Sequence, residues 1–498
     1  MDRRQMLKTT AAGITLAATG RARASGPPNI ILILADDIGY GDLGCYSANR
    51  VRTPNLDRIA AEGVRCTDAH SSSAVCTPTR YSLLTGQYAF RRPEASYILS
   101  GAAPLCIDPS RPTLPSVLRA AGYATGMVGK WHLGLGTRER PVDYNGEIAP
   151  GPLEVGFDSA FFIPATGDRV PCVFIEDRRV VGLDPADPIS VSFFYKIGDD
   201  PTGLERPDLL KMKADLSHSG TIVNGISRIG YMSGGHAARW VDEDIPDTLA
   251  RRAVAFIEAN RDRPFFLYLP THDVHEPMAP NARFKGTSDC GSRGDVIHQL
   301  DWTVGEVLAA LDRTGLADNT LVIFSSDNGG GIKNTYDDGT NALHSRQPPN
   351  GKLRGGKGQL YEGGHRVPLV ARWPGRIKPC SESSELMCLI DMIPTLAAVA
   401  GASVPKNAAP DAVDVSPALL GLPHDQPCRD HLLLHISGPG PLAVRKGEWK
   451  LIPLAAGGMP NQLFNLADDL SEQHNLALRR PDKVMELFGA LARERGRG

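Results

Sequence analysis

The sequence is poor in several features that mark common protein classes. Its formal net charge is only −2 over 498 residues, whereas a nucleic-acid-binding protein normally carries a basic surface, so we expect no nucleic-acid partner. No stretch reaches the roughly 20 apolar residues that a membrane-spanning helix needs, and we expect no stable membrane insertion. The chain has no CxxC pair, which leaves a zinc or dithiol redox site without support. It also lacks internal repeats and low-complexity tracts.

What the chain does contain is typical of a large globular protein. Apolar residues make up 42% and charged residues 22%, and 498 residues can form one large domain and a smaller one. Residues 1–24 are similar to a twin-arginine export signal, because Arg3-Arg4 precedes a short apolar run and Ala22-Arg23-Ala24 offers a cleavage site. The alternative is an ordinary basic N-terminus. The signal predicts a periplasmic or secreted bacterial protein.

Apolar runs followed by polar clusters recur along the chain and predict its fold class. The runs at 29–35, 264–269 and 320–324 have the composition of strands buried on both faces. Helical patterns occur between and beside them at 57–62, 114–121, 246–260 and 296–311. Such alternation implies an α/β protein with a largely parallel sheet wrapped by helices. In these sheets ligands bind beyond the carboxyl ends of the strands, where the polar clusters fall.

The remaining segments are less regular. Residues 140–245 are rich in Gly, Pro and Asp, which predicts long loops and short strands inserted above the site. A helix is predicted over 389–400, and strand-like and helical patterns after residue 431 predict a smaller C-terminal α+β subdomain. The expected division is a main domain over 25–405, a linker over 406–430 and a subdomain over 431–498.

The most informative segment is Cys76-Thr77-Pro78-Thr79-Arg80. Thr77 can cap a helix and Pro78 fits its first turn, so the exposed amides and the positive dipole end there favour an anion. Arg80 adds a permanent, fork-shaped cation. The segment resembles the signature at which type I sulfatases convert a cysteine to formylglycine. The alternative is that Cys76 is an ordinary buried thiol or a disulfide partner.

Other segments resemble the same family, the sulfatase branch of the alkaline phosphatase superfamily, in the family's order. They are residues 36–42, 53–57, 84–86, 129–134, 327–329, 355–358 and 361–364. The resemblance covers about residues 29–380, with a weaker match at 445–451 and 463–466. It implies a large, mostly parallel mixed sheet sandwiched by helices. It also implies hydrolysis of sulfate monoesters by the hydrated aldehyde that a formylglycine-generating maturation enzyme makes from Cys76.

The resemblance implies a metal site as well. Its ligands would be Asp36, Asp37, Asp327, Asn328 and the modified Cys76. The unmodified ligands offer oxygen donors, which suit a hard cation, with calcium first and magnesium next. Each aspartate alone is more often a helix cap or turn residue. Their position after two predicted strands favours the metal site instead.

A sulfate monoester is a fixed anion, so its hydrolysis requires a cationic clamp. Lys130 and His132 stand two residues apart in a segment that looks extended, which predicts both on one face and Trp131 in the packing on the other. The resemblance implies that both contact the sulfate and formylglycine oxygens, with His132 drawing a proton from the diol. It assigns Arg80 and Lys357 to the same clamp, and Lys357 helps to protonate the leaving group. A lone lysine is more often a solvated surface charge.

The leaving oxygen needs a proton, and two histidines follow the predicted strand at 264–269. His275 stands one residue before a proline, as the family's pattern requires, so we assign the general acid to His275. His272 then shapes the pocket or is a structural histidine.

Substrate contacts are expected in the loops. The polar candidates are Thr166 and Asp168 in the segment 166–169, with His236, His272, His344 and Arg346, although loop residues are polar in any case. We expect an exo-acting sulfatase on a sulfated carbohydrate. The alternatives are a formylglycine-dependent phosphonate monoester or phosphodiester hydrolase, and a noncatalytic glycan-binding protein that keeps the fold.

The cysteine content leaves disulfide bonding open. Nine cysteines are present, and setting Cys76 aside as modified leaves an even number, which is compatible with disulfides in an oxidising compartment. Their pairing cannot be deduced from the sequence, and free buried thiols are the alternative.

Overall fold

The computed structural model describes residues 26–343, 346–453 and 460–496. The predicted export signal at 1–24 lies outside these residues. The centre of the described part is a ten-stranded sheet with strand order β17-β2-β16-β14-β1-β13-β4-β5-β6-β7. Its strands are β1 (Asn29–Ala35), β2 (Val64–Cys66), β4 (Ala124–Lys130), β5 (Ser159–Ile163), β6 (Ile175–Glu176), β7 (Arg179–Val180), β13 (Phe265–Pro270), β14 (Thr320–Ser326), β16 (Leu369–Arg372) and β17 (Ser381–Ser383).

The sheet is mixed but mostly parallel in its central part. β1 pairs in parallel with β13 and β14, and β4 and β5 continue the parallel set. β16 runs antiparallel to β14 and to β2. The predicted α/β fold is therefore confirmed, and the predicted strand at 29–35 coincides with β1.

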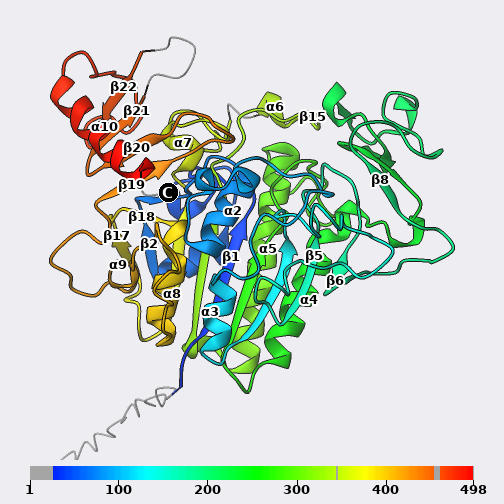
Figure 1. The fold of residues 1–498 in the computed structure, drawn as a ribbon, viewed down its shortest axis with the longest axis horizontal. Coiled ribbons are helices and arrows are strands. Elements are labelled where there is room, and N and C mark those ends of the chain that lie inside the picture. Colours follow the sequence, from blue (N-terminus) through cyan, green and yellow to red (C-terminus); the bar gives the residue numbers. More distant parts are fainter. Residues whose placement is uncertain (1–25, 344–345, 454–459, 497–498) are drawn as a thin grey trace, which may run out of the picture.

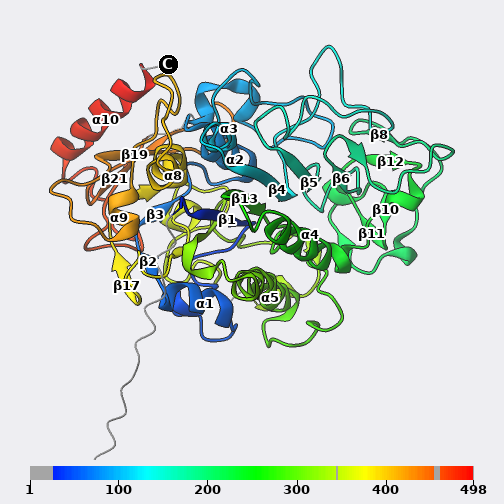
Figure 2. The ribbon, with the colours of Figure 1, turned by 90° about the horizontal axis from the view of Figure 1, so that it is seen from below.

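Helices cover both faces of this sheet (Figures 1 and 2). They are α1 (Pro54–Ala61), α2 (Cys76–Thr85), α3 (Leu114–Ala120), α4 (Ile245–Ala259), α5 (Gly291–Thr314) and α8 (Met392–Ala400), with the short α6 (Thr340–Leu343), α7 (Glu362–His365) and α9 (Ser416–Leu420). Ile30 and Leu32 of β1 pack in one apolar cluster with α2, α3 and α8, whereas Ile31 and Ile33 pack with α1, α4 and α5. Because alternate residues of β1 meet different helix layers, the apolar run in the sequence is uninterrupted.

A smaller antiparallel sheet follows the main domain. Its strands are β19 (His431–Leu434), β20 (Ala443–Lys446), β21 (Trp449–Ile452) and β22 (Gln462–Asn465), and α10 (Pro481–Arg495) packs on β20 and β21. The apolar cluster of this sheet also takes in Tyr88 and Ile390 of the main domain. The predicted C-terminal α+β subdomain is thus present, and Figure 1 shows it at one end of the molecule.

Residues 140–245 fold mainly as loops with short strands, as expected. The short strands of this segment outside the main sheet are β8 (Ser190–Ser192), β9 (Lys213–Ala214), β10 (Ile222–Val223), β11 (Ile226–Ser227) and β12 (Tyr231–Ser233). Elsewhere in the described residues, further short strands are β3 (Ala69–His70), β15 (Tyr336–Asp337) and β18 (Met387–Cys388). The segment 406–430 contains α9, whose Leu419 is buried.

All nine cysteines lie in the described residues and all are free thiols. In the same residues no helix has the length and apolar content needed to cross a membrane.

Candidate active site

The site lies where β1 and β14 end. These strands are parallel neighbours and pair in register to their last residues, so the residues that follow come side by side. Asp36 and Asp37 continue from β1, and Asp327 and Asn328 continue from β14; all four are buried. A backbone bond of 3.1 Å from Asp327 N to Ala35 O fixes this arrangement. The structure therefore brings the four unmodified members of the predicted metal site together.

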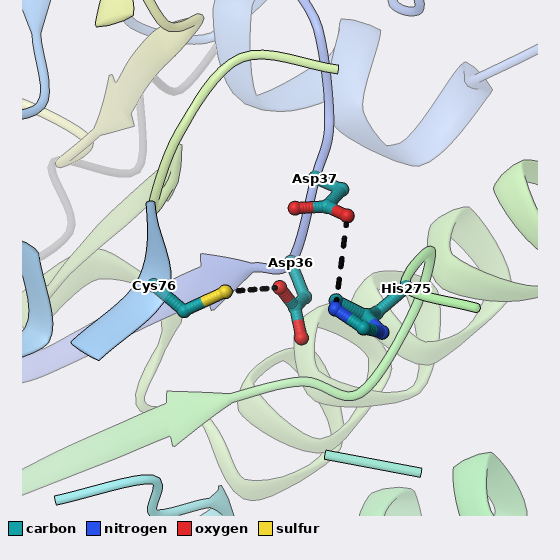
Figure 3. Close-up of side chains that lie close together, drawn as sticks. All are labelled: Asp36, Asp37, Cys76 and His275. Carbon is teal, nitrogen blue, oxygen red and sulfur yellow. Dashed lines mark hydrogen bonds and ion pairs between the residues drawn. The ribbon is translucent and has the colours of Figure 1, made fainter. Parts of the chain in front are cut away.

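Cys76 is the first residue of α2 and is buried beside Asp36. Its Sγ lies 3.7 Å from Asp36 Oδ1 (Figure 3). Burial raises the pKa of the Cys76 thiol to about 12, although the charges of Lys130 and Lys357 oppose that shift. The encoded thiol is therefore protonated at neutral pH, and a protonated thiol is a weak nucleophile.

The start of α2 differs from the prediction in one respect. Val75 occupies the N-cap position without a side-chain hydrogen bond, and Thr77 lies inside the first turn instead of capping it. Thr77 Oγ1 donates to the carbonyl of His132 at 3.0 Å. The predicted cap is thus wrong, because the helix begins one residue before Thr77. The threonine instead ties the first turn of α2 to the segment after β4.

Ion pairs hold two cationic side chains, those of Arg80 and Lys130, in the buried part of the site. Arg80 Nε and Nη2 donate to one oxygen of Asp327 at 2.9 and 2.7 Å, and its Nη1 donates to the carbonyl of Lys130 at 3.1 Å. Lys130 Nζ pairs with Asp36. Both cations are fully buried, so these ion pairs fix their positions. Two groups of the predicted clamp are therefore held next to the predicted metal site.

Asp37 lies between the outer charged groups. Lys357 Nζ donates to its Oδ2 at 2.8 Å, Asn328 Nδ2 donates to its Oδ1 at 2.7 Å, and His275 Nε2 lies 3.9 Å from Oδ2 (Figure 3). Burial alone would raise the pKa of Asp37, but the charges of Lys357 and His275 outweigh it and the pKa is lowered. Burial and Lys357 together lower the pKa of His275 to about 4. The Lys357 side chain is 22% exposed, whereas those of Asp37 and His275 are 9% and 5% exposed.

The donor set fits a hard cation. Asn328 Oδ1 is buried and has no hydrogen-bond partner within the described residues. Burial and the charge of Asp36 raise the pKa of Asp327, as expected for carboxylates that share a buried site. A bound cation would relieve both effects, and carboxylate and amide oxygens are the ligands that calcium prefers. A second possible set of metal ligands is Asp36, Asp37, Cys76 and His275. Each of these residues offers one ligand atom, and the four atoms all lie within 4.8 Å of one another.

Residues 28–402, most of the chain, match the sulfatase family model. The chain belongs to the sulfatase family. Residues 356–491 also match the model described as N-sulphoglucosamine sulphohydrolase, C-terminal. The sulfatase is 46% identical over 476 residues to N-acetylgalactosamine-6-O-sulfatase of Bacteroides thetaiotaomicron, covering 93% of this chain and 92% of the relative. Human arylsulfatase A is 37% identical over 498 residues, covering 95% of this chain and 86% of the relative.

Solved structures agree with this family. A protein solved in work on the metabolism of multiple glycosaminoglycans by Bacteroides thetaiotaomicron gives a TM-score of 0.90 at 46% identity, covering 94% of this chain and 99% of that chain. A phosphonate monoester hydrolase from Silicibacter pomeroyi gives a TM-score of 0.61 at 17% identity, covering 94% and 95%, and shows the shared fold alone. The predicted type I sulfatase of the alkaline phosphatase superfamily is confirmed.

His132 of the sulfatase departs from the extended segment that the sequence suggested. β4 ends at Lys130, and His132 has a φ of 57°, so the alternation rule does not place its side chain. Its Nε2 lies 2.9 Å from the carbonyl of Leu99 and must donate there, while Nδ1 is buried without a partner in the described residues. Burial and Lys130 hold the pKa of His132 well below its usual value. Trp131 is buried in the core, as predicted.

His272 is also buried close to this centre. Its ring lies against Gly167, where a Cβ atom would approach Cε1 to 2.5 Å. Burial and the charge of His275 lower the pKa of His272 to about 4. His275 Nε2 lies 3.9 Å from Asp37 Oδ2. The assignment of the leaving-group proton to His275 stays a prediction.

Thr166 and Asp168 lie in the loop beside His272. Thr166 Oγ1 donates to Asp168, which also pairs with Arg169 at 3.1 Å and with His218 at 3.4 Å. Asp168 is buried, and its charge acts on His275. His218 is not among the residues that the sequence indicated, because the irregular segment around it carries no local pattern that marks a site residue.

Two other candidates, His236 and Arg346, do not join this cluster. The side chain of His236 is 60% exposed and pairs with Asp187 and Asp200. Arg346 is exposed, and its Nη1 donates to the carbonyl of Asp289 at 3.4 Å. The structure gives neither residue a contact with the site residues above. His344 lies outside the described residues.

Proposed function

We propose that the protein hydrolyses the sulfate monoester of a sulfated carbohydrate from a chain end, with formylglycine at residue 76 and calcium beside it. The observation that carries this proposal is the position of Cys76 at the start of α2, 3.7 Å from Asp36 and among buried cations. The relative that is 46% identical is named N-acetylgalactosamine-6-O-sulfatase. We therefore expect a 6-sulfated N-acetylgalactosamine as the substrate class.

The side chains of the protein supply the binding of the anion. The first-turn amides of α2 and the side chains of Arg80, Lys130 and Lys357 place positive charge around residue 76. Arg80 and Lys130 are held by buried carboxylates, so little reorganisation is needed when a sulfonyl group binds. Lys357 is partly exposed, so it can contact a substrate that arrives from solvent.

Two groups add chemistry that the encoded side chains lack. Asp36, Asp37, Asp327 and Asn328 would hold a calcium ion, which would add positive charge to the anion-binding site. A formylglycine hydrate at residue 76 would offer two hydroxyl groups, one to attack sulfur as the sugar alcohol leaves and one to lose a proton as sulfate is released and the aldehyde forms again.

Two histidines suit the proton transfers. His132 Nδ1 is a buried acceptor with no partner in the described residues, so it can take the proton from the second hydroxyl group. His275 has a pKa lowered to about 4 by burial and Lys357, and the negative charge of a bound sulfate raises it. Its ring then donates a proton to the leaving oxygen.

The burial of Cys76 bears on maturation. Its side chain is 1% exposed, so a formylglycine-generating enzyme cannot reach it in the folded protein. We propose that conversion precedes folding and that the matured protein is then exported to the periplasm or beyond.

A panel of substrates tests the proposed function. Fully converted, calcium-loaded protein is assayed for inorganic sulfate release from sulfated mono- and disaccharides and for hydrolysis of matched nitrophenyl sulfate and phosphonate esters. We expect the highest kcat/KM on a sulfated sugar and no activity in Cys76→Ala. A higher kcat/KM on the phosphonate ester would favour the phosphonate hydrolase, and no turnover of any ester would favour a noncatalytic glycan-binding protein.

A further inference from the structure

The backbone of Leu99 forms a wall of the site beside the nucleophile. Its N–H donates to Thr77 Oγ1 at 3.3 Å, and Thr77 directly follows Cys76. The carbonyl of Leu99 accepts from His132 Nε2 at 2.9 Å and from Arg169 Nη1 at 3.2 Å. Leu99 is therefore fixed by three hydrogen bonds to residues around the reacting position.

Two large apolar side chains precede this fixed point and face solvent. Tyr97 is 51% exposed and Ile98 is 39% exposed. Two residues of chain span at most about 7 Å, so the Tyr97 backbone lies within that distance of Leu99. This distance is comparable with one sugar residue. The Tyr97 backbone is thus at most two residues of chain away from this wall, and its half-exposed side chain can meet a ligand there.

The C-terminal subdomain supports the Tyr97 ring. Gly438 lies in the loop between β19 and β20, and a Cβ atom there would come within 2.7 Å of Tyr97 Cε1. Gly438 N donates to the carbonyl of Ser96 at 2.6 Å, and Ser437 Oγ donates to the same carbonyl at 3.1 Å. The ring therefore packs on a backbone surface that is hydrogen-bonded to its own segment. About half of the side chain remains free for a ligand.

We infer that Tyr97 is a stacking surface for the sugar ring adjoining the sulfated sugar, an assignment that rests on the proposed function. The sulfated ring must occupy the space over Cys76 and against Leu99 for its sulfate to react. A supported aromatic ring within two residues of Leu99 then meets the next ring of the saccharide. The apolar C–H face of a pyranose packs on an aromatic face, and a held tyrosine loses little conformational freedom in the contact.

The test compares substrates that have and lack the adjoining ring. In Tyr97→Ala, we expect kcat/KM on a sulfated disaccharide to fall about tenfold, mainly through KM, the size of effect typical of one aromatic contact. The kcat/KM on the sulfated monosaccharide and on nitrophenyl sulfate should stay within about twofold of wild type. Tyr97→Phe should keep disaccharide activity, because it keeps the ring.

Two further variants separate stacking from folding. Tyr97→Leu keeps an apolar contact with Gly438 and should show the disaccharide defect without a fall in melting temperature. Phe194, 92% exposed after β8, is the matched surface aromatic, and Phe194→Ala should behave as wild type. An unchanged disaccharide kcat/KM in Tyr97→Ala would overturn the inference, as would an equal loss on the monosaccharide. Wild-type protein that hydrolyses nitrophenyl sulfate but neither sugar would overturn the proposed function together with the inference.

Discussion

The two histidines that follow β13 carry different consequences for the reaction. A sugar alkoxide is strongly basic and needs a proton as it leaves, whereas nitrophenolate leaves almost unaided. We expect His275→Ala to cost at least about tenfold more kcat/KM on a sugar sulfate than on nitrophenyl sulfate. Steady-state kinetics on the two esters measure this difference. Arg80→Ala is the control and should lower both comparably, because it clamps the sulfonyl group that both esters share.

The opposite pattern would exchange the roles of the two histidines. If His272→Ala shows the dependence on the leaving group and His275→Ala does not, the choice based on the proline motif is wrong. At this scale the sequence indicated which residues gather, because motifs record chemical identity. It did not predict the conformation of Thr77 or His132, since a helix start and a positive φ depend on neighbours such as Leu99 that are distant in sequence.

A cation bound at the carboxyl ends of β1 and β14 should stabilise the folded protein. Asp36 and Asp327 are buried there close to Asp37, and a cation that binds only the folded state stabilises it by mass action. We expect chelation to lower both activity and melting temperature, and calcium to restore them. Asp327→Asn should weaken the response of the melting temperature to calcium, measured by thermal unfolding with and without the ion.

A surface carboxylate provides the control for the calcium response of the melting temperature. Asp312 of α5 pairs with Arg58 at 3.0 Å and is 44% exposed, so Asp312→Asn should keep the full response to calcium. Stoichiometric zinc that calcium cannot replace would contradict the ligand assignment. The sequence predicted β1 well because both of its faces are buried. It could not predict the pairing in the insertion, where strands of two or three residues such as β10 and β11 are held by contacts that leave no periodic pattern.

In the whole molecule, the C-terminal subdomain is joined to the main domain by buried charges. Arg445 of β20 binds both oxygens of Asp68 at 2.6 and 2.7 Å. Lys450 of β21 pairs with Glu362 at 2.9 Å and with Glu472 at 2.8 Å, and these three side chains are fully buried. No local pattern could predict this interface, because 377 positions separate Arg445 from Asp68 in the sequence.

We expect Lys450→Met to destabilise the protein by ~3–5 kcal/mol, because it removes the cation that Glu362 and Glu472 share while both carboxylates stay buried. Activity should fall as well, because the subdomain is hydrogen-bonded to the segments that carry Cys76 and Lys357. Ala74 N donates to His435 O and Gly358 N donates to Ala74 O, each at 2.9 Å. Denaturant unfolding and kcat measure the two effects. Lys483→Met, which removes an i,i+3 pair on α10, should cost less than about 0.5 kcal/mol. Equal stability of the two variants would show that the buried charges do not hold the domains together.

The most direct test of the proposed chemistry is sulfate release from N-acetylgalactosamine 6-sulfate by preparations that differ in aldehyde content at residue 76. Mass spectrometry of the tryptic peptide 66–80 gives the converted fraction in each preparation. We expect the rate per chain to rise in proportion to that fraction, from zero when the peptide carries only the thiol. Cys76→Ser made without a serine-competent maturation enzyme should be inactive. Sulfate release at the full rate by protein whose residue 76 is entirely an unmodified thiol would contradict the account.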